Sequence, residues 1–260
     1  MATRVMGVLN VTPDSFSDGG RFTDPEAAVA RGLEMKLEGA DVIDVGGEST
    51  RPGALPVGET EERRRVLEVV AALASDIAVS VDTRSAAVAE AAVEAGASLI
   101  NDVSASLWPV AAALGVGWVA MHMQGEPRTM QLDPRYDDVV SEVRSFLLAR
   151  AEQAGAAGVR EVWIDPGIGF GKRLEHNLAL VRCLDHLVDT GVPVLVGASR
   201  KGFLGALLGG APTDDRLEGS LAVAVWAATS GVGMVRVHDV AATVQALRLV
   251  GDTTTTPVTV

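Results

Sequence analysis

The chain has 260 residues, of which 48% are hydrophobic, and it carries a formal net charge of −12 at pH 7. An acidic chain repels nucleic acid and anionic membrane surfaces, so we expect neither as a partner, and an anionic small substrate would need a local cluster of cations. The single cysteine, Cys183, excludes an intramolecular disulfide and a cysteine-based zinc site. These features favour a cytoplasmic protein that binds small molecules.

Eight short apolar runs, rich in β-branched residues, are predicted as strands. They cover residues 5–11, 41–45, 77–82, 98–102, 116–122, 161–166, 193–199 and 233–239. Most are continuous rather than alternating, which is typical of parallel strands covered on both faces. Two long uncharged stretches, residues 103–121 and 219–235, are shorter than the roughly 20 residues that span a bilayer, so we interpret each as a buried helix leading into a strand.

Helical periodicity fills the segments between the strands. Clear helical patterns cover residues 24–40, 59–75, 84–97, 137–158, 174–189, 216–231 and 240–250. In the first of them, Asp24 is the expected N-cap, Pro25 the first helical residue and Gly39 the C-terminal stop. Eight strand–helix units predict an α/β chain closed into a (β/α)8 TIM barrel. We expect a single domain over residues 1–260, with a core from about 5 to 250 and a flexible tail over 251–260.

Polar residues follow nearly every predicted strand. They are Asn10, Asp44, Asp82, Asn101, Asp102, His122, Asp165, Ser199, Arg200, Lys201, Arg236 and His238. Active sites of this fold lie at the C-terminal ends of the strands. Capping of the next helix is the alternative for Asp82 and Asp102, and Asp44, before a glycine pair, can be structural. Capping alone does not explain eight polar strand ends, so we expect a site at this rim.

The residue types at the rim indicate two kinds of ligand group. Asn101 and Asp165 together suit a flat heterocycle with an amino-amide edge, because a carboxylate accepts two parallel N–H bonds. Lys201, Arg236 and His238 form the expected cation cluster after the last two strands, where such barrels often hold phosphate. Arg236 and His238 are two residues apart and share one face of a strand. The alternatives are a rim salt bridge for Arg236 and a core position for His238.

Two connecting segments, residues 10–20 and 46–54, are rich in glycine and polar residues. We interpret both as lids that close over the site and exclude water, with ordinary surface loops as the alternative. The segment of residues 165–172 resembles a phosphate-binding P-loop only loosely, because Arg173 follows Lys172 where a hydroxyl residue would stand.

The chain resembles the bacterial dihydropteroate synthases, a pterin-binding TIM-barrel family, over about residues 5–250. Nine segments carry the resemblance in order: NVTPDSFSDGG, DVGGESTRPG, SVDT, IND, MHMQGEP, DPGIGFGK, VGASRKGFLG, RLEGSLA and RVHDV. It implies a transferase of folate biosynthesis, which condenses 6-hydroxymethyl-7,8-dihydropterin diphosphate with p-aminobenzoate and gives 7,8-dihydropteroate and pyrophosphate. It also implies Mg2+ as the cofactor, inhibition by sulfonamides and a homodimer. Ile168 and Gly202 depart from the residues usual in the family.

The resemblance also implies a role for each matching residue. The pterin ring would contact Asp82, Asn101, Met121, Asp165 and Lys201. The diphosphate would contact Thr50, Arg51, Arg236 and His238, with Asn10 as the Mg2+ ligand. The aminobenzoate pocket would be framed by Phe16, Asp18, Pro52, Phe170, Ser199 and Lys201. The residues expected to act in catalysis are Lys201, Asp165, Asp18 and Arg236.

The family's mechanism is described as dissociative, with negative charge developing on pyrophosphate and positive charge on the pterin methylene. Mg2+, Arg236 and His238 would stabilise the first charge, and Asp165 and Asp18 the second. Three alternatives remain: a methyltransferase that supplies a corrinoid protein, a paralogue that only binds pterin, and a Schiff-base aldolase using Lys201. Against the aldolase, we expect Lys201 to stay protonated rather than desolvated.

Overall fold

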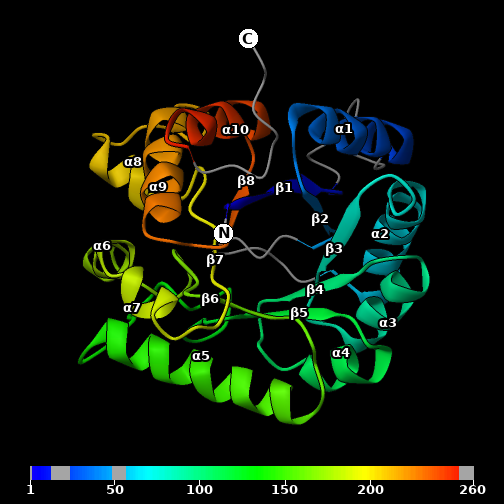
Figure 1. Cartoon of the computed structure of the whole chain (residues 1–260), viewed down its shortest axis with the longest axis horizontal. Helices are drawn as coiled ribbons and strands as arrows, with labels where there is room; N and C mark the ends of the chain where they lie inside the picture. The colour runs from blue at the N-terminus through cyan, green and yellow to red at the C-terminus, as the bar shows by residue number, and fades with distance from the viewer. Residues whose placement is uncertain (1, 13–23, 49–56, 252–260) are drawn as a thin grey trace.

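The structure is a computed structural model that describes residues 2–12, 24–48 and 57–251, and it contains one sheet of eight parallel strands (Figure 1). The strands are β1 (Arg4–Asn10), β2 (Val42–Gly46), β3 (Ala78–Asp82), β4 (Leu99–Asp102), β5 (Gly117–Met121), β6 (Val162–Asp165), β7 (Leu195–Val196) and β8 (Met234–Val237). Their order is β6-β5-β4-β3-β2-β1-β8-β7, and a parallel bridge between Ile164 and Val194 joins the two ends. The predicted TIM barrel is confirmed.

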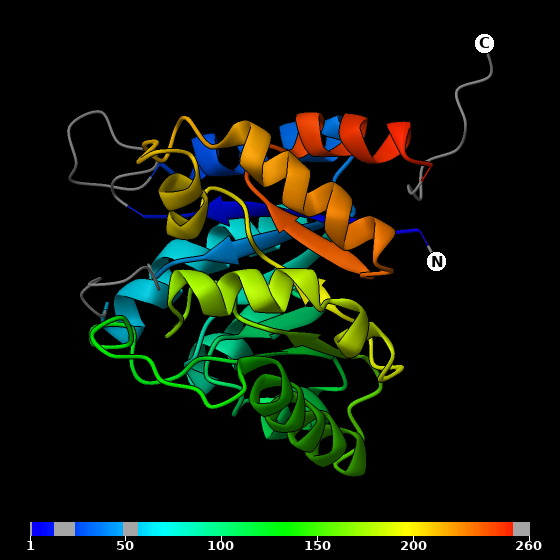
Figure 2. The ribbon, with the colours of Figure 1, turned by 90° about the vertical axis from the view of Figure 1, so that its left-hand side faces the viewer.

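Helices surround the barrel on the outside, as Figures 1 and 2 show from two directions. They are α1 (Pro25–Glu38), α2 (Glu59–Leu73), α3 (Ala86–Glu94), α4 (Trp108–Leu114), α5 (Val139–Ala156), α6 (Leu174–Arg182), α7 (Asp185–Val188), α8 (Gly202–Leu207), α9 (Leu217–Thr229) and α10 (Val240–Leu249). The ends predicted for α1 are confirmed, because Asp24 accepts hydrogen bonds from the backbone of Glu26 and Ala27 and Gly39 has a φ of 104°. None of the described helices has the length and apolar character needed to cross a bilayer.

Three predictions about the elements need correction. The helix predicted over residues 174–189 is two helices, α6 and α7, with a break after Arg182. Helix α8 was not predicted, because it has only six residues and follows a strand directly. Strand β7 has two residues instead of the seven predicted, since the chain leaves the sheet after Val196 and turns at Ser199 and Arg200. The tail predicted over residues 251–260 stays a prediction.

The interior of the barrel is built in layers. Seven buried side chains from seven strands form an apolar layer: Met6, Val42, Leu99, Val119, Trp163, Leu195 and Met234. Side chains alternate across a strand, so the residue two positions further along also points into the barrel. On four of these strands that residue is polar or charged, namely Asp44, Asn101, Asp165 and Arg236, and Asp82 of β3 lies level with Asn101. We call these five residues the polar layer, and it lies toward the C-terminal ends of the strands.

Candidate active site

The centre of the polar layer is a single guanidinium held by two carboxylates. Arg236 Nε donates to Asp44 Oδ2 at 2.6 Å, and Arg236 Nη2 donates to Asp82 Oδ2 at 2.8 Å. Asn101 Nδ2 donates to the same Asp44 oxygen at 2.9 Å. Asp44 therefore joins a residue expected at the pterin ring to one expected at the diphosphate. The salt bridge considered as an alternative role for Arg236 does exist, but it lies inside the barrel, where Asp44 is 0% exposed.

Two carboxylate oxygens of this network have no partner. Within the described part of the chain, Asp44 Oδ1 and Asp82 Oδ1 are buried and accept no hydrogen bond. A buried acceptor without a donor costs about 1–3 kcal/mol, more when it is charged. A donor that reached either oxygen would relieve this cost.

Burial and mutual repulsion shift the pKa values of the polar layer. Burial, together with the neighbouring charge of Asp44, raises the pKa of Asp82 to about 7, although Arg236 acts in the opposite direction. Burial also raises the pKa of Asp165, despite the nearby charge of Lys201. For Arg236, burial alone lowers the pKa, but Asp44 and Asp82 outweigh it and hold the pKa above its ordinary value. Arg236 therefore stays charged, while Asp82 can take up a proton near neutral pH.

Glycines make room for these side chains. A β-carbon at Gly46 would lie 3.5 Å from the Asp82 side chain and 3.9 Å from Asn10 Oδ1. A β-carbon at Gly197 would lie 3.6 Å from Arg236 Cβ and 3.9 Å from Asp165 Oδ2. A larger side chain at either glycine would therefore enter the space between the charged groups.

Asp165 is fixed by the loop that follows β6. Its Oδ1 accepts the backbone N–H of Gly167 at 2.7 Å. Gly167 has a φ of +63°, and a β-carbon there would lie only 1.8 Å from the carbonyl oxygen of His122, so no other residue fits. The loop after β6 is consequently pressed against the end of β5.

Lys172 holds this loop from inside. Its Nζ donates to the carbonyl oxygens of Gly167 and Phe170, both at 3.0 Å, and lies 2.9 Å from His122 Nδ1. Burial lowers the pKa of Lys172 to about 7, and burial and the charge of Lys172 lower the pKa of His122 to about 3. The ammonium of Lys172 is engaged by protein carbonyls and the His122 ring, so the loose P-loop resemblance of this segment does not reflect a phosphate site. The sequence analysis named Lys172 and Asp44 but assigned neither of them a role at the site.

Lys201 stands at the start of α8 and faces the same loop. Its ammonium donates to the carbonyl oxygen of Ile168 and lies 4.5 Å from the centre of the Phe170 ring. The prediction that Lys201 escapes desolvation is wrong, because burial lowers its pKa to about 8. The amine nevertheless remains mostly protonated at neutral pH, as an aldolase lysine would not.

A cavity of about 680 Å3 opens above the polar layer. Its walls include these predicted site residues: Asn10, Asp82, Phe170, Ser199, Lys201, Arg236 and His238. Asn101, Met121 and Asp165 are each 4% exposed at their strand ends and do not form its walls. Ser199 and His238 are neighbours, since the backbone N–H of His238 donates to Ser199 Oγ at 3.2 Å. The strands thus bring together residues that are up to 228 positions apart, from Asn10 to His238.

Phe16, Asp18, Thr50, Arg51 and Pro52 lie outside the described residues, so their roles stay predictions. Both predicted lids fall mostly in the same two gaps.

Neither of the two aspartates for which capping was considered caps the next helix, and α4 has Leu107 as its N-cap without a side-chain hydrogen bond. Asp102 accepts backbone N–H groups of Ser104 and Leu107, at 2.8 and 2.6 Å, and orders the turn before α4. Asp82 does not cap α3, whose N-cap is Ser85. Asp102 therefore has a structural role, and Asp82 belongs to the polar layer.

A metal site would depend on few protein ligands. Among the described residues there is no cluster of three or more His, Cys, Asp or Glu side chains that could hold a metal ion. Asn10 lies at the rim of the cavity, and its side chain forms no hydrogen bond within the described part of the chain. Mg2+ commonly takes one or two protein oxygens and completes its shell with phosphate and water. An amide oxygen at Asn10 fits that pattern.

The family "Pterin binding enzyme" matches residues 6–238. The dihydropteroate synthase of Mycobacterium leprae is 50% identical over 263 residues, covering 95% of this chain and 92% of that protein. Solved structures of dihydropteroate synthases are similar in sequence and fold, and three of them illustrate the likeness. The Yersinia pestis dihydropteroate synthase with a sulfonamide drug complex has a TM-score of 0.90 and 46% identity, and it covers 96% of this chain and 94% of that one.

The other two are dihydropteroate synthases of Xanthomonas albilineans. The structure with 4-aminobenzoic acid has a TM-score of 0.90 and 48% identity, and it covers 98% of this chain and 94% of that one. The complex with 7,8-dihydropteroate has a TM-score of 0.87 and 45% identity, covering 98% and 95%. With a barrel, a buried polar layer and these likenesses along nearly the whole length, the chain belongs to the dihydropteroate synthase family of pterin-binding enzymes.

Proposed function

We propose that this chain makes 7,8-dihydropteroate from 6-hydroxymethyl-7,8-dihydropterin diphosphate and p-aminobenzoate by a dissociative substitution at the pterin methylene. The observation that carries the proposal is the pair of buried carboxylate oxygens that have no donor among the described residues, Asp44 Oδ1 and Asp82 Oδ1, next to a fixed guanidinium. A pterin ring presents several N–H groups, and its diphosphate supplies the negative charge that a guanidinium attracts.

The pterin ring is held by the polar layer in this proposal. Asp165 keeps one oxygen on the Gly167 N–H and presents the other to the amino-amide edge of the ring. Asn101, oriented by Asp44, both donates and accepts along the same plane. Met121 lies in register with Asp165 on the neighbouring strand and supplies an apolar wall.

The leaving group is stabilised at the rim. The bond between the pterin methylene carbon and the diphosphate oxygen breaks, and the electron pair stays with the diphosphate. Arg236 remains charged at all physiological pH values and meets the developing charge, with His238 beside it. Mg2+, held by Asn10 together with diphosphate oxygens, would supply further positive charge to the leaving group when bound. Thr50 and Arg51 are proposed to assist.

The aminobenzoate nitrogen then forms the new carbon–nitrogen bond and releases its extra proton to water. A neutral arylamine is nucleophilic without deprotonation, so the site needs no strong base. Asp165, and Asp18 from the first lid, stabilise the positive charge at the methylene. Phe170, Ser199 and Lys201 frame the aminobenzoate pocket with Phe16 and Pro52. Since aminobenzoate, dihydropteroate and sulfonamide occur in the related structures, we extend them as ligands to this chain.

Two tests address the proposal. Purified chain given pterin diphosphate, p-aminobenzoate and Mg2+ is expected to release pyrophosphate and dihydropteroate in equal amounts, and omission of aminobenzoate is the control. Ligand binding without pyrophosphate release would instead support the pterin-binding paralogue. In the second test, Arg236→Ala is expected to lose diphosphate binding while bare pterin still binds, measured by calorimetry. Equal loss of both ligands would contradict the division of roles.

We also propose a homodimer in the cytoplasm. Support comes from the family resemblance and from exposed apolar side chains on neighbouring helices, with Leu207 at 50% and Trp226 at 49% exposure. Sedimentation equilibrium is expected to give twice the chain mass at micromolar concentration. A monomer at that concentration would rule the dimer out.

A further inference from the structure

Arg200 has an unusual backbone at the edge of the active site. It stands between Ser199 and Lys201, which both form walls of the cavity, and its φ is +59°. Among the described residues, only Ala105 and Arg200 combine a β-carbon with a positive φ. Such a conformation is disfavoured by steric contacts and persists only where surrounding contacts hold it in place.

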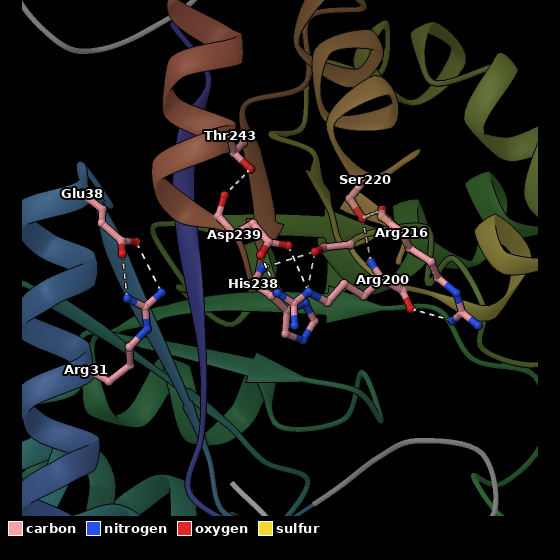
Figure 3. Close-up of polar contacts among 9 residues, drawn as sticks. Arg31, Glu38, Arg200, Arg216, Ser220, His238, Asp239 and Thr243 are labelled. Carbon is pink, nitrogen blue, oxygen red and sulfur yellow. Dashed lines mark hydrogen bonds and ion pairs between the residues drawn. The ribbon is translucent and has the colours of Figure 1, made fainter. Parts of the chain in front are cut away.

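The side chain of Arg200 is held by Asp239, the residue before α10. Arg200 Nε donates to Asp239 Oδ2 at 3.0 Å, and Nη2 donates to the other carboxylate oxygen, so the contact is a two-pronged ion pair. Figure 3 shows Arg200 and Asp239 facing each other beside His238. One side chain at the end of β8 thus restrains the turn after β7.

The backbone of Arg200 is held by α9. Its N–H donates to Ser220 Oγ at 2.9 Å, and its carbonyl oxygen accepts Arg216 Nη1 at 2.9 Å (Figure 3). Arg216 and Ser220 both belong to the segment RLEGSLA, which has no assigned ligand. A β-carbon at Gly205 would lie 2.5 Å from Arg216 Nη2 and 2.7 Å from the carbonyl oxygen of Ala211, so glycine is required for Arg216 to reach the turn.

We propose that Arg200 is a positioning residue, and that Asp239, Arg216 and Ser220 together hold it in the left-handed turn that directs Ser199 and Lys201 into the cavity. The inference rests on the roles proposed above for Ser199 and Lys201. Lys201 follows Arg200 as the N-cap of α8, and Ser199, which precedes Arg200, accepts the backbone N–H of His238 at its Oγ. A relaxation of φ at Arg200 therefore moves both groups relative to Arg236 and His238.

A second ion pair on the same rim provides a matched control. Arg31 and Glu38 of α1 also form a two-pronged contact, at 2.7 and 3.3 Å, and line the same outer crevice as Arg200 and Asp239 (Figure 3). The two pairs are similarly exposed. The side chains of Arg31 and Glu38 are 28% and 20% exposed, and those of Arg200 and Asp239 are 38% and 21% exposed. Among the described residues, neither Arg31 nor Glu38 forms a hydrogen bond or an ion pair with Ser199, Arg200 or Lys201.

The test compares Arg200→Ala, Arg200→Gly and Glu38→Gln in the full-length chain. Arg200→Ala retains the steric penalty of a positive φ but loses the ion pair that holds it, so we expect φ to relax and kcat/KM for aminobenzoate to fall about tenfold or more, since small displacements of positioned groups are costly. Arg200→Gly adopts a positive φ without strain, so part of the loss is expected to be recovered. Glu38→Gln is expected to stay within about twofold of wild type.

A purely structural role predicts a different order. If Arg200→Ala matched Glu38→Gln in both kcat and KM, or if Arg200→Gly were no better than Arg200→Ala, the inference would be overturned. Melting temperatures show whether each variant is folded. Should Arg200→Ala fail to fold, Asp239→Asn removes the ion pair at nearly constant size, and a kcat/KM equal to wild type would overturn the inference.

The affinity for pterin diphosphate compares wild type with the two Arg200 variants independently of turnover. We expect the affinity for pterin diphosphate to follow the order wild type, Arg200→Gly, Arg200→Ala, because Lys201 shifts with the turn. An unchanged affinity in both Arg200 variants, with kcat/KM also unchanged, would contradict the inference. An inactive wild type that still shows this order of affinities would contradict the proposed chemistry but leave the positioning role supported.

Discussion

Two layers of side chains inside one barrel, only two residues apart along the strands, have opposite properties. The apolar layer, which includes Trp163 and Met234, is almost fully buried and is stabilised by packing. The polar layer directly above it holds one guanidinium between two carboxylates and, among the described residues, leaves two buried oxygens without donors. Buried ion pairs give little net stability, because desolvation offsets most of the attraction. The comparison indicates that the lower layer stabilises the fold and the upper layer is kept for ligands.

Trp163→Ala tests the apolar layer and has the largest expected effect on stability. Truncation of a large buried aromatic side chain costs about 3–5 kcal/mol, so we expect a loss of that size in the free energy of unfolding. Asp165 lies two residues further along the same strand, and the folded variant is expected to keep KM for both substrates within a few-fold. Urea denaturation and steady-state kinetics measure the two quantities. A KM change of a hundredfold with intact stability would contradict the separation of the layers.

Asp165→Asn tests the polar layer on the same strand. Asparagine keeps the shape and can still accept the Gly167 N–H, but it removes the charge that faces the pterin. We expect kcat/KM to fall about 100-fold, the usual cost of one group that stabilises developing charge. The free energy of unfolding without ligand is expected to stay equal or to rise, because burial already disfavours this carboxylate. A large loss of stability with normal activity would reverse the assignment of the layers.

The pH dependence of stability sharpens the comparison at Asp82. Its pKa is raised to about 7 in the folded chain, above the roughly 3.9 of an unfolded aspartate, so the folded state binds the extra proton. The stability from this group is therefore complete below about pH 4 and is lost as the pH rises through about 7. Relative to Asp82→Asn, the wild type should lose on the order of 2 kcal/mol between these pH values.

The free energy of unfolding is compared between wild type and Asp82→Asn because other groups titrate in the same pH range. His122, with a pKa lowered to about 3, contributes stability above its unfolded pKa of about 6.5 that is lost as the pH falls, which is the opposite sign. The difference between wild type and Asp82→Asn cancels that contribution. Equal pH profiles for the two chains would show that the Asp82 pKa is not raised.

Phe170→Leu has the smallest expected effect, at the edge of the polar layer. The substitution keeps an apolar side chain but removes the ring below the Lys201 ammonium, an interaction of about 0.5–2 kcal/mol. We expect KM for aminobenzoate to rise a few-fold with little change in kcat. Phe170→Tyr, which keeps the ring, is the control and should remain near wild type. Equal effects of the two substitutions on KM would show that the contact between the Phe170 ring and the Lys201 ammonium does not contribute to aminobenzoate binding.

Much of the fold was accessible from the sequence because the signals are local. Continuous apolar runs identified all eight strands, and Asp24, Pro25 and Gly39 identified both ends of α1. Strand β7 was predicted too long because apolar residues at 193–199 fit a strand, whereas the turn at Arg200 depends on contacts from α9 and α10. Local patterns cannot report contacts made 20 and 39 residues away.

The site was only partly accessible for the same reason. Polar strand ends indicated the rim, and the resemblance implied individual roles. Asp44 looked structural beside its glycine pair, yet its carboxylate joins Arg236 to Asn101, which lie 192 and 57 residues away in sequence. Lys172 received no role once the P-loop was rejected, although its ammonium donates to two carbonyl oxygens of the loop that follows Asp165 and includes Phe170.

By itself, the sequence determined the alternation of strands and helices, the location of polar groups at the strand ends and the family. The tertiary structure alone decided which charges meet, since barrel closure brings β2, β3 and β8 together around one guanidinium. It also decided the protonation of Asp82 and Lys201, because a pKa depends on burial and neighbouring charge rather than on residue type. Hydrophobic periodicity is a property of the nearest residues along the chain, whereas electrostatics is a property of the nearest residues in space.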